Sequence, residues 1–230
     1  MTITVIIPVL NEAKNIAGLV RYVHLNGGQA VQEVLVVDGG STDDTVAEAQ
    51  GAGARVIRCA VQSRAAQMNA GAREARGQVL YFVHADALPP ATFVSDIQET
   101  FEAGFKMGCY RYRFDSPRFL LKINAYFNRF DALSCQGGDK TFFLHREIFA
   151  EFGGYDEYYT IMEEYDFLRR ALKRYRLRTI PKYAVVSARK YEQNGWLRVQ
   201  LANIVVFNLF LLGAAPARMK RIYKKLIRNW

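Results

Sequence analysis

The sequence predicts an α/β protein: a mostly parallel sheet with helices on both faces, followed by further helices at the carboxyl end. Short apolar runs recur along the first half of the chain, and each is bounded by glycine, proline or polar turn residues. Runs of this kind are typical of strands that are buried on both faces of a sheet. Helix-like stretches separate them, and that alternation predicts parallel strands. Half of the 230 residues are hydrophobic, which argues against disorder and suffices for a well-filled core.

Four of the expected strands lie in the first half of the chain, residues 1–105. Each is a run of branched or aromatic apolar residues, and they lie at 2–9, 34–37, 55–59 and 79–83. We expect Pro8 to stop the first strand, because proline cannot donate a ladder hydrogen bond. Ser41 or Thr42 is expected to cap the second helix, and Ser63 the third, since such side chains accept a bond from the helix start.

The second half of the chain, residues 106–195, breaks this rhythm. The alternation at 110–114 is typical of a half-exposed strand, and 161–175 has the spacing of a helix. Two short strands are expected around Arg178 and Val185. No low-complexity linker separates the halves, so the two together are expected to form one domain that ends at residue 195.

The last segment, residues 196–230, combines an apolar stretch with a basic one. Its apolar part, 197–212, is shorter than the roughly 20 residues needed to span a bilayer. Beyond Pro216, cationic residues interleave with apolar ones up to Trp230. This pattern predicts either an interfacial helix on an anionic membrane or a helix packed on the domain with a solvated basic face.

The net charge of +9 favours an anionic partner such as a nucleoside diphosphate or an acidic lipid. No nucleic-acid-binding motif accompanies it, so we do not expect nucleic acid as a partner. The three cysteines are scattered and form no CxxC pair, which is typical of buried thiols in a reducing compartment. No signal peptide is evident. We therefore expect a cytoplasmic protein, with contact to the inner face of the membrane as an option and an oligomer as another.

Asp38 follows the apolar run at 34–37 and precedes Gly39-Gly40-Ser41. Open α/β sheets bind ligands at the carboxyl ends of parallel strands, where Asp38 is expected to lie. Its carboxylate suits the N–H edge of a base or a ribose hydroxyl. An ordinary turn from strand to helix explains the same residues, so this stretch alone leaves both interpretations open.

His84-Ala85-Asp86 ends the fourth strand, and the two polar side chains, two residues apart, are expected to point to one face. Either could hold a divalent cation that bridges a diphosphate, and hard cations prefer the carboxylate of Asp86. The motif is a weak signal by itself.

The acidic cluster of the second half comprises Glu163, Glu164 and Asp166. One of these carboxylates can act as the base that removes a proton from an attacking hydroxyl. Arginines and lysines follow closely, so a salt-bridged helix face is the competing interpretation. Asp139, after Gly137-Gly138, is the next acidic candidate near an acceptor.

Basic residues that can meet phosphate lie in two other places. Arg64 is expected at a helix start, where its charge and the helix terminus can act together on an anion. Arg189-Lys190 lies in an expected loop and can neutralise a leaving diphosphate.

In this order, the motifs resemble the family 2 glycosyltransferases, which have the GT-A fold, a Rossmann-like sheet. The resemblance covers nearly the whole chain and is specific in combination. It rests on Val5-Ile6-Ile7-Pro8-Val9-Leu10-Asn11-Glu12, Val36-Val37-Asp38-Gly39-Gly40-Ser41-Thr42-Asp43-Asp44-Thr45, Asn69-Ala70-Gly71-Ala72, His84-Ala85-Asp86 and Met162-Glu163-Glu164-Tyr165-Asp166-Phe167. Three details resemble a subgroup associated with arsenosugar-type biosynthetic clusters: 64–69, the His-Ala-Asp form and Ser187-Ala188-Arg189.

The resemblance implies that Pro8, Glu12 and Asp38 line the pocket for the nucleotide base and ribose. It implies that Asp86 takes the metal-binding place of a DxD motif, with Mg²⁺ or Mn²⁺ as cofactor. It also implies that Glu164 is the catalytic base of an inverting enzyme, with Glu163 before it.

This chain departs from the family pattern at three points. Gly39 stands where a second aspartate usually follows Asp38, and His84 stands at the first aspartate of DxD. The base is glutamate rather than aspartate. The change at His84 puts metal affinity in doubt, and Arg64, Arg189 and Lys190 are then expected to share the neutralisation of the diphosphate.

The expected function is transfer of a sugar from a nucleoside diphosphate sugar to an acceptor hydroxyl or phosphate. A UDP-sugar is favoured over a GDP-sugar as donor. The acceptor is unidentified, and a lipid-linked acceptor is one option. A non-catalytic module that binds a nucleotide sugar or a lipid is the alternative. It would gain if Glu164 proved dispensable.

Overall fold

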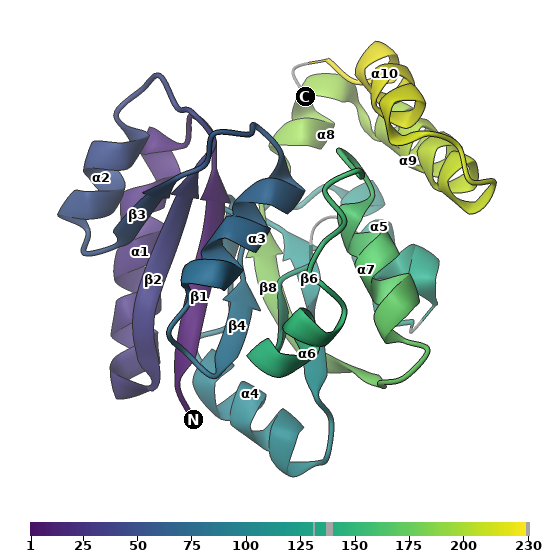
Figure 1. The fold of residues 1–230 in the computed structure, drawn as a ribbon. Helices are drawn as coiled ribbons and strands as arrows, with labels where there is room; N and C mark the ends of the chain where they lie inside the picture. Colours follow the sequence, from purple (N-terminus) through teal and green to yellow (C-terminus); the bar gives the residue numbers. More distant parts are fainter. Residues whose placement is uncertain (131, 137–139, 229–230) are drawn as a thin grey trace.

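The computed structural model describes residues 1–130, 132–136 and 140–228, and it confirms the α/β architecture (Figure 1). One sheet has the strand order β3-β2-β1-β4-β7-β6-β8-β5. The strands are β1 (Ile3–Val9), β2 (Val31–Asp38), β3 (Arg55–Arg58), β4 (Val79–Phe82), β5 (Ala87–Leu88), β6 (Met107–Phe114), β7 (Phe142–His145) and β8 (Leu177–Val186).

The first half of the chain forms the parallel part of this sheet. β1 pairs in parallel with β2 and β4, and β2 with β3. β7 runs antiparallel between β4 and β6, and the short β5 runs antiparallel to β8. β6 and β8 pair in parallel. The parallel strands therefore end at one common edge, as the sequence predicts.

Helices cover both faces of the sheet. They are α1 (Ala13–Gly27), α2 (Thr45–Gly51), α3 (Arg64–Glu74), α4 (Phe93–Glu102), α5 (Phe119–Phe127), α6 (Arg146–Glu151), α7 (Glu163–Ala171), α8 (Arg189–Asn194), α9 (Trp196–Leu211) and α10 (Pro216–Leu226). Single 3₁₀ turns lie at Gly28–Ala30 and Leu133–Cys135. In Figure 1, α3 and α6 lie in front of the sheet.

The two faces of the sheet bury two separate hydrophobic clusters. Val34 and Val36 of β2 belong to one, which also takes in side chains of α1, α4, α9 and α10. Leu35 and Val37 belong to the other, with side chains of α3, α6 and α7. Successive residues of a strand point to opposite faces, so a continuous apolar run is what this two-sided burial requires.

Four local expectations were wrong, one of them the cap at Ser63, which precedes α3 but makes no side-chain bond to the start of that helix. β1 continues through Pro8 to Val9, because β4 pairs with β1 only as far as Ile6 and the missing N–H of proline interrupts no ladder there. The two strands expected around Arg178 and Val185 are one strand, β8, whose register with β6 shifts once.

The fourth concerns the start of the second helix. α2 begins at Thr45, so neither Ser41 nor Thr42 caps it. Asp43 accepts a hydrogen bond from the Thr45 amide instead, at 3.1 Å. The serine hydroxyl is used elsewhere, since it accepts a bond from the Asn11 amide.

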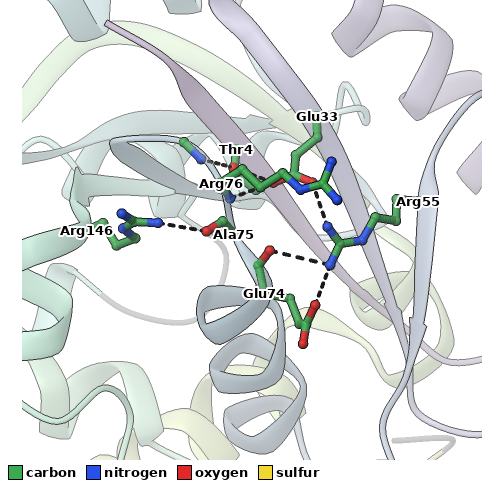
Figure 2. A network of polar contacts seen from close by, with 8 residues as sticks. Thr4, Glu33, Arg55, Glu74, Ala75, Arg76 and Arg146 are labelled. Atoms are coloured by element: carbon green, nitrogen blue, oxygen red, sulfur yellow. Dashed lines mark hydrogen bonds and ion pairs between the residues drawn. The ribbon is translucent and has the colours of Figure 1, made fainter.

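The amino-terminal edge of the parallel strands is closed by a polar network around Glu33 (Figure 2). The Glu33 carboxylate accepts hydrogen bonds from the Thr4 hydroxyl at 3.1 Å and from the Arg76 amide at 2.7 Å. Arg55 joins Glu33 to Glu74. These contacts tie β1, β2, β3 and the end of α3 together at the edge opposite to the expected ligand site.

The carboxyl-terminal helices are part of the core. α9 and α10 lie side by side (Figure 1), and their buried residues join the same cluster as the sheet: Val199, Ala202, Val206, Phe210, Met219, Tyr223 and Ile227. Among the described residues, no helix combines the length and apolar character needed to cross a membrane.

Candidate active site

Asp38 organises the loop that follows β2. Its side chain is only 3 % exposed and accepts hydrogen bonds from the amides of Gly40 and Ser41, each at 3.1 Å. Gly40 has φ of 97°, a conformation that residues with a Cβ rarely adopt. The aspartate therefore holds the loop in shape, and its remaining lone pairs are what a ligand could use.

Asn11 locks this loop to the end of β1. Its side-chain oxygen accepts a bond from the Thr42 amide at 2.8 Å, and its own amide donates to Ser41 Oγ at 2.9 Å. Asn11 has φ of 55°, which asparagine tolerates better than most residues. Glu12 is fixed through its amide, which donates to Thr45 Oγ1 at 2.8 Å. Pro8 and Glu12, both expected at the nucleotide pocket, thus lie beside the Asp38 loop.

Gln67 of α3 is a positioning residue that sequence reasoning missed. Its buried side-chain amide donates to the carbonyl oxygens of Val9 and Val37, at 2.8 and 2.7 Å. It therefore holds the carboxyl ends of β1 and β2 next to each other. The available signal was a glutamine within residues 65–72, which are otherwise mostly small or apolar apart from Asn69.

His84 and Asp86 lie in a turn rather than on a strand, which corrects the expectation that they share a face. β4 ends at Phe82, and the Ala87 amide donates to the His84 carbonyl. The turn sends the two side chains to different partners. His84 Nε2 lies 3.2 Å from Glu164 Oε1, while the exposed Asp86 faces the region of Arg189.

Glu163 and Glu164 begin α7, directly after Met162, whose φ of 70° is unusual for a bulky residue. Glu163 is buried, and its carboxylate lies 3.8 Å from the Arg64 guanidinium. Burial raises the pKa of Glu163, and the positive charge of Arg64 opposes that rise. Two carboxylates with different surroundings thus sit side by side at one helix start.

These residues line a cavity of about 570 Å³. Arg64 and Ser63 contribute from the start of α3, Glu163 and Glu164 from α7, and Lys190 from α8. Its other walls come from α5, α9 and α10. Two of the three acidic residues and two of the three basic residues, distant in the sequence, therefore line one cavity.

Arg189 lies outside that cavity and joins the two halves of the molecule. Its guanidinium donates to Glu12 Oε1 at 2.8 Å, which raises the pKa of Arg189, and Asp86 adds to the same effect. The three side chains form a charged group beside the Asp38 loop.

Asp166 lies apart from this group. Its carboxylate accepts hydrogen bonds from Arg169 and Arg170, at 3.1 and 2.8 Å, and it lines a different, more open cavity. Asp139, the other residue expected near an acceptor, falls outside the described residues.

A divalent cation fits at Asp86 only if the substrate completes its coordination. The described part of the chain has no group of three or more histidine, cysteine, aspartate or glutamate side chains that could hold an ion. Mg²⁺ is commonly bound by one or two carboxylates plus substrate phosphates, and the exposed carboxylate of Asp86 suits that arrangement. His84 as a metal ligand remains a prediction, because its Nε2 is directed at Glu164.

The fold is an α/β fold whose polar candidate residues, Asp38 among them, gather near the carboxyl ends of the parallel strands. The model of the family "Glycosyl transferase family 2" matches residues 4–157. The chain therefore belongs to glycosyl transferase family 2, as its motifs predict. Membership of the arsenosugar-type subgroup remains a prediction.

Curated relatives match only part of this chain. A glucosyl-3-phosphoglycerate synthase from Mycolicibacterium paratuberculosis is 33 % identical over 97 residues, which are 39 % of this chain and 30 % of the relative. The same enzyme from Mycolicibacterium smegmatis is 39 % identical over 56 residues, or 24 % of this chain and 18 % of the relative. The matches thus span less than a third of either relative.

Solved structures confirm the fold over nearly the whole chain. A mannosyltransferase from Pyrobaculum calidifontis, in complex with GDP-mannose and Mn²⁺, has a TM-score of 0.67 at 20 % identity and covers 96 % of this chain and 67 % of its own. The glucosyl-3-phosphoglycerate synthase of Mycobacterium tuberculosis, in complex with Mn²⁺, UDP and its product, has a TM-score of 0.63 at 19 % identity and covers 93 % and 80 %.

Proposed function

We propose that the protein is an inverting glycosyltransferase that moves a sugar from a nucleoside diphosphate sugar to an acceptor hydroxyl or phosphate. The observation that carries the proposal is Glu164, whose carboxylate lines the cavity and lies 3.2 Å from His84 Nε2. The similar structures contain UDP or GDP-mannose. We favour a UDP-sugar as donor because the similar glucosyl-3-phosphoglycerate synthase structures contain UDP or UDP-glucose.

The donor occupies the carboxyl ends of β1 and β2 in this proposal. The loop held by Asp38, together with Pro8 and Glu12, receives the base and ribose. Asp86 holds Mg²⁺ or Mn²⁺, which when bound would neutralise the charge of the diphosphate. Arg64, Arg189 and Lys190 add positive charge on the diphosphate side of the donor. They share in neutralising the diphosphate, because the metal site has few protein ligands.

Glu164 removes the proton from the acceptor. The acceptor oxygen attacks the anomeric carbon, the bond from that carbon to the diphosphate oxygen breaks, and the proton passes to the Glu164 carboxylate. His84 Nε2, at 3.2 Å, fixes the orientation of this carboxylate. Glu163 holds Arg64 in place through their ion pair.

Calorimetry with UDP and GDP, each with Mn²⁺ and with excess EDTA, tests the donor half of the proposal. We expect UDP to bind more tightly than GDP, and EDTA to weaken binding. If UDP binds equally well with Mn²⁺ and with excess EDTA, the three basic residues alone neutralise the diphosphate. Unchanged transfer by Glu164→Gln would instead favour a non-catalytic binding module.

We also propose that α9 and α10 contact an anionic lipid surface. The apolar side chains of α10, among them Met219 and Tyr223, are buried, so this helix does not itself insert. The outer face of α9 is apolar and exposed instead, as shown by Leu197 at 74 % and Leu201 at 52 %. Exposed cations of the neighbouring α10 complement acidic head groups: Arg218, Arg221, Lys224 and Lys225, with Arg228 just after the helix.

Flotation with anionic and neutral vesicles tests this contact. We expect binding to anionic vesicles at low salt, and weaker binding for Leu197→Ser/Leu201→Ser. Leu25→Ser, at an exposed leucine on α1, is the matched control. A dimer in sedimentation that Leu201→Ser abolishes, without vesicle binding, would assign the apolar face to an oligomer contact.

A further inference from the structure

Two buried polar atoms of the cavity lack a partner. Ser63 Oγ and Gln200 Nε2 are both inaccessible to solvent and make no hydrogen bond with any described residue. Both residues line the 570 Å³ cavity, Ser63 from the turn before α3 and Gln200 from α9. Folded proteins leave few buried polar atoms unsatisfied, because each one loses its bonds to water without replacement. Two such atoms on one cavity point to a ligand that completes them.

The two residues line the same cavity as Glu163 and Glu164. Ser63 immediately precedes Arg64, whose guanidinium is 3.8 Å from Glu163. Gln200 lies one helical turn from Asn203 and two from Phe207 on the same side of α9, and all three line the cavity. An amide N–H and a hydroxyl are donors to hydroxyl, ether or carbonyl oxygens. The ligand that they recognise is therefore rich in neutral oxygen atoms.

Apolar side chains form the outer part of the same cavity. Phe127 of α5 is 53 % exposed and Ile204 of α9 is 58 % exposed, yet both line the cavity. Leu201 and Leu197 continue the exposed apolar face of α9 away from Ile204, at spacings of three and four residues. A ligand bound at Gln200 thus has an apolar surface beside it on which a hydrophobic group can lie.

We propose that Gln200 and Ser63 bind the acceptor by hydrogen bonds, and that the acceptor is a hydroxyl-rich molecule with an attached apolar group. The inference rests on the proposed glycosyl transfer, since it names the substrate class for the acceptor side of that site. It makes α9 part of the specificity-determining machinery and gives a reason for glutamine and asparagine within an otherwise apolar helix.

The test uses octyl glucoside below its micelle concentration as the amphiphilic probe and glucose as the tail-free probe. Binding to the full-length protein, in the presence of UDP and Mn²⁺, is measured by calorimetry. We expect octyl glucoside to bind at least about tenfold more tightly than glucose, since part of its chain leaves water. Gln200→Met and Ser63→Ala should each weaken octyl glucoside binding by about tenfold, the effect of losing one buried hydrogen bond.

A thermal-shift measurement on the ligand-free variants separates this role from a structural one. Gln200→Met replaces an unpartnered donor with an apolar side chain of similar shape, so the Tm should stay equal or rise. Gln193→Met, the same change at an exposed site on α8, is the matched control and should change neither affinity nor Tm.

Three outcomes would overturn the inference. Wild-type affinity for octyl glucoside in both Gln200→Met and Ser63→Ala would show that neither atom contacts the ligand. Equal affinity for glucose and octyl glucoside would contradict an apolar group on the acceptor. Binding of neither would contradict the proposed class of acceptor. The affinity for UDP is measured separately in the wild type and in each variant. A wild-type protein that does not bind UDP would contradict the proposed function rather than this inference.

Discussion

The three carboxylates at the start of α7 have different surroundings. Glu164 contacts His84 at the cavity, whereas the neighbouring Glu163 is buried against Arg64 and Asp166 is bound by two arginines on another face. Along the chain these three carboxylates look interchangeable. Their surroundings differ: Glu164 lines the cavity, Glu163 is paired with the Arg64 guanidinium, and Asp166 is held by two arginines of α7.

Glu164→Gln should lower the rate of sugar transfer by about 10²–10⁴-fold, because the acceptor hydroxyl then keeps its proton during attack. Nucleotide affinity should stay unchanged. Steady-state kinetics and calorimetry with UDP measure the two quantities. Asp166→Asn is the control, which should lose less activity but lower the Tm, since its buried carboxylate accepts bonds from Arg169 and Arg170. A larger loss of rate in Asp166→Asn than in Glu164→Gln would reverse the assignment.

Glu163→Gln should raise the Tm at neutral pH. Burial raises the pKa of Glu163 in the folded protein. The folded state therefore gains stability from protonated Glu163 at a pH below the ordinary pKa of glutamate. That stability is lost as the pH rises through the raised pKa. The Tm difference between variant and wild type should therefore grow from about pH 4 to about pH 8. Calorimetric scans across that range measure it. A constant difference would mean that Arg64 fully compensates for the burial.

At the scale of elements, the turns after β1 and β2 form one unit. Asn11, Asp38 and Gln67 bond the two turns to each other and to α3. A ligand at this edge meets a surface that is already ordered, so little entropy has to be lost on binding.

Asp38→Ala should weaken UDP binding by about 1–3 kcal/mol and also lower the Tm, because the amides of Gly40 and Ser41 lose their acceptor. Asp38→Asn keeps one acceptor oxygen and should lose less of both. Calorimetry with UDP and thermal unfolding measure the two effects. If Asp38→Ala lowers the Tm with full UDP affinity, Asp38 acts on the loop alone.

At the scale of the molecule, one cluster of side chains runs from the sheet into α9 and α10. The Glu33 network of Figure 2 closes the edge of the sheet that faces away from the site. The boundary expected at residue 195 remains a prediction, and the packing favours a single cooperative unit.

A chain ending at residue 195 should unfold at a Tm more than about 5 °C lower than the full chain, because it exposes the surface on which Val206 and Phe210 pack. The full chain should unfold in one transition. Scanning calorimetry on both chains gives the Tm and the number of transitions. Two resolved transitions, or an unchanged Tm after truncation, would make the last segment an independent unit.

The sequence by itself determined the layered α/β fold, the family and the candidate residues. These features depend on local signals: apolar runs such as 34–37, turn residues such as Gly39-Gly40, and motifs with fixed spacing. Such signals are fixed by residues that are neighbours along the chain, so they can be read without knowing how distant segments pack.

The tertiary structure alone decided which side chains meet. His84 turns to Glu164 instead of sharing a face with Asp86. The apolar side of α10 is buried, whereas α9 buries one apolar face and exposes a second. Gln200 meets the cavity only because α9 folds back over α7. Contacts between residues far apart in the sequence depend on packing and on where each turn aims the chain, and no local pattern of residues encodes either.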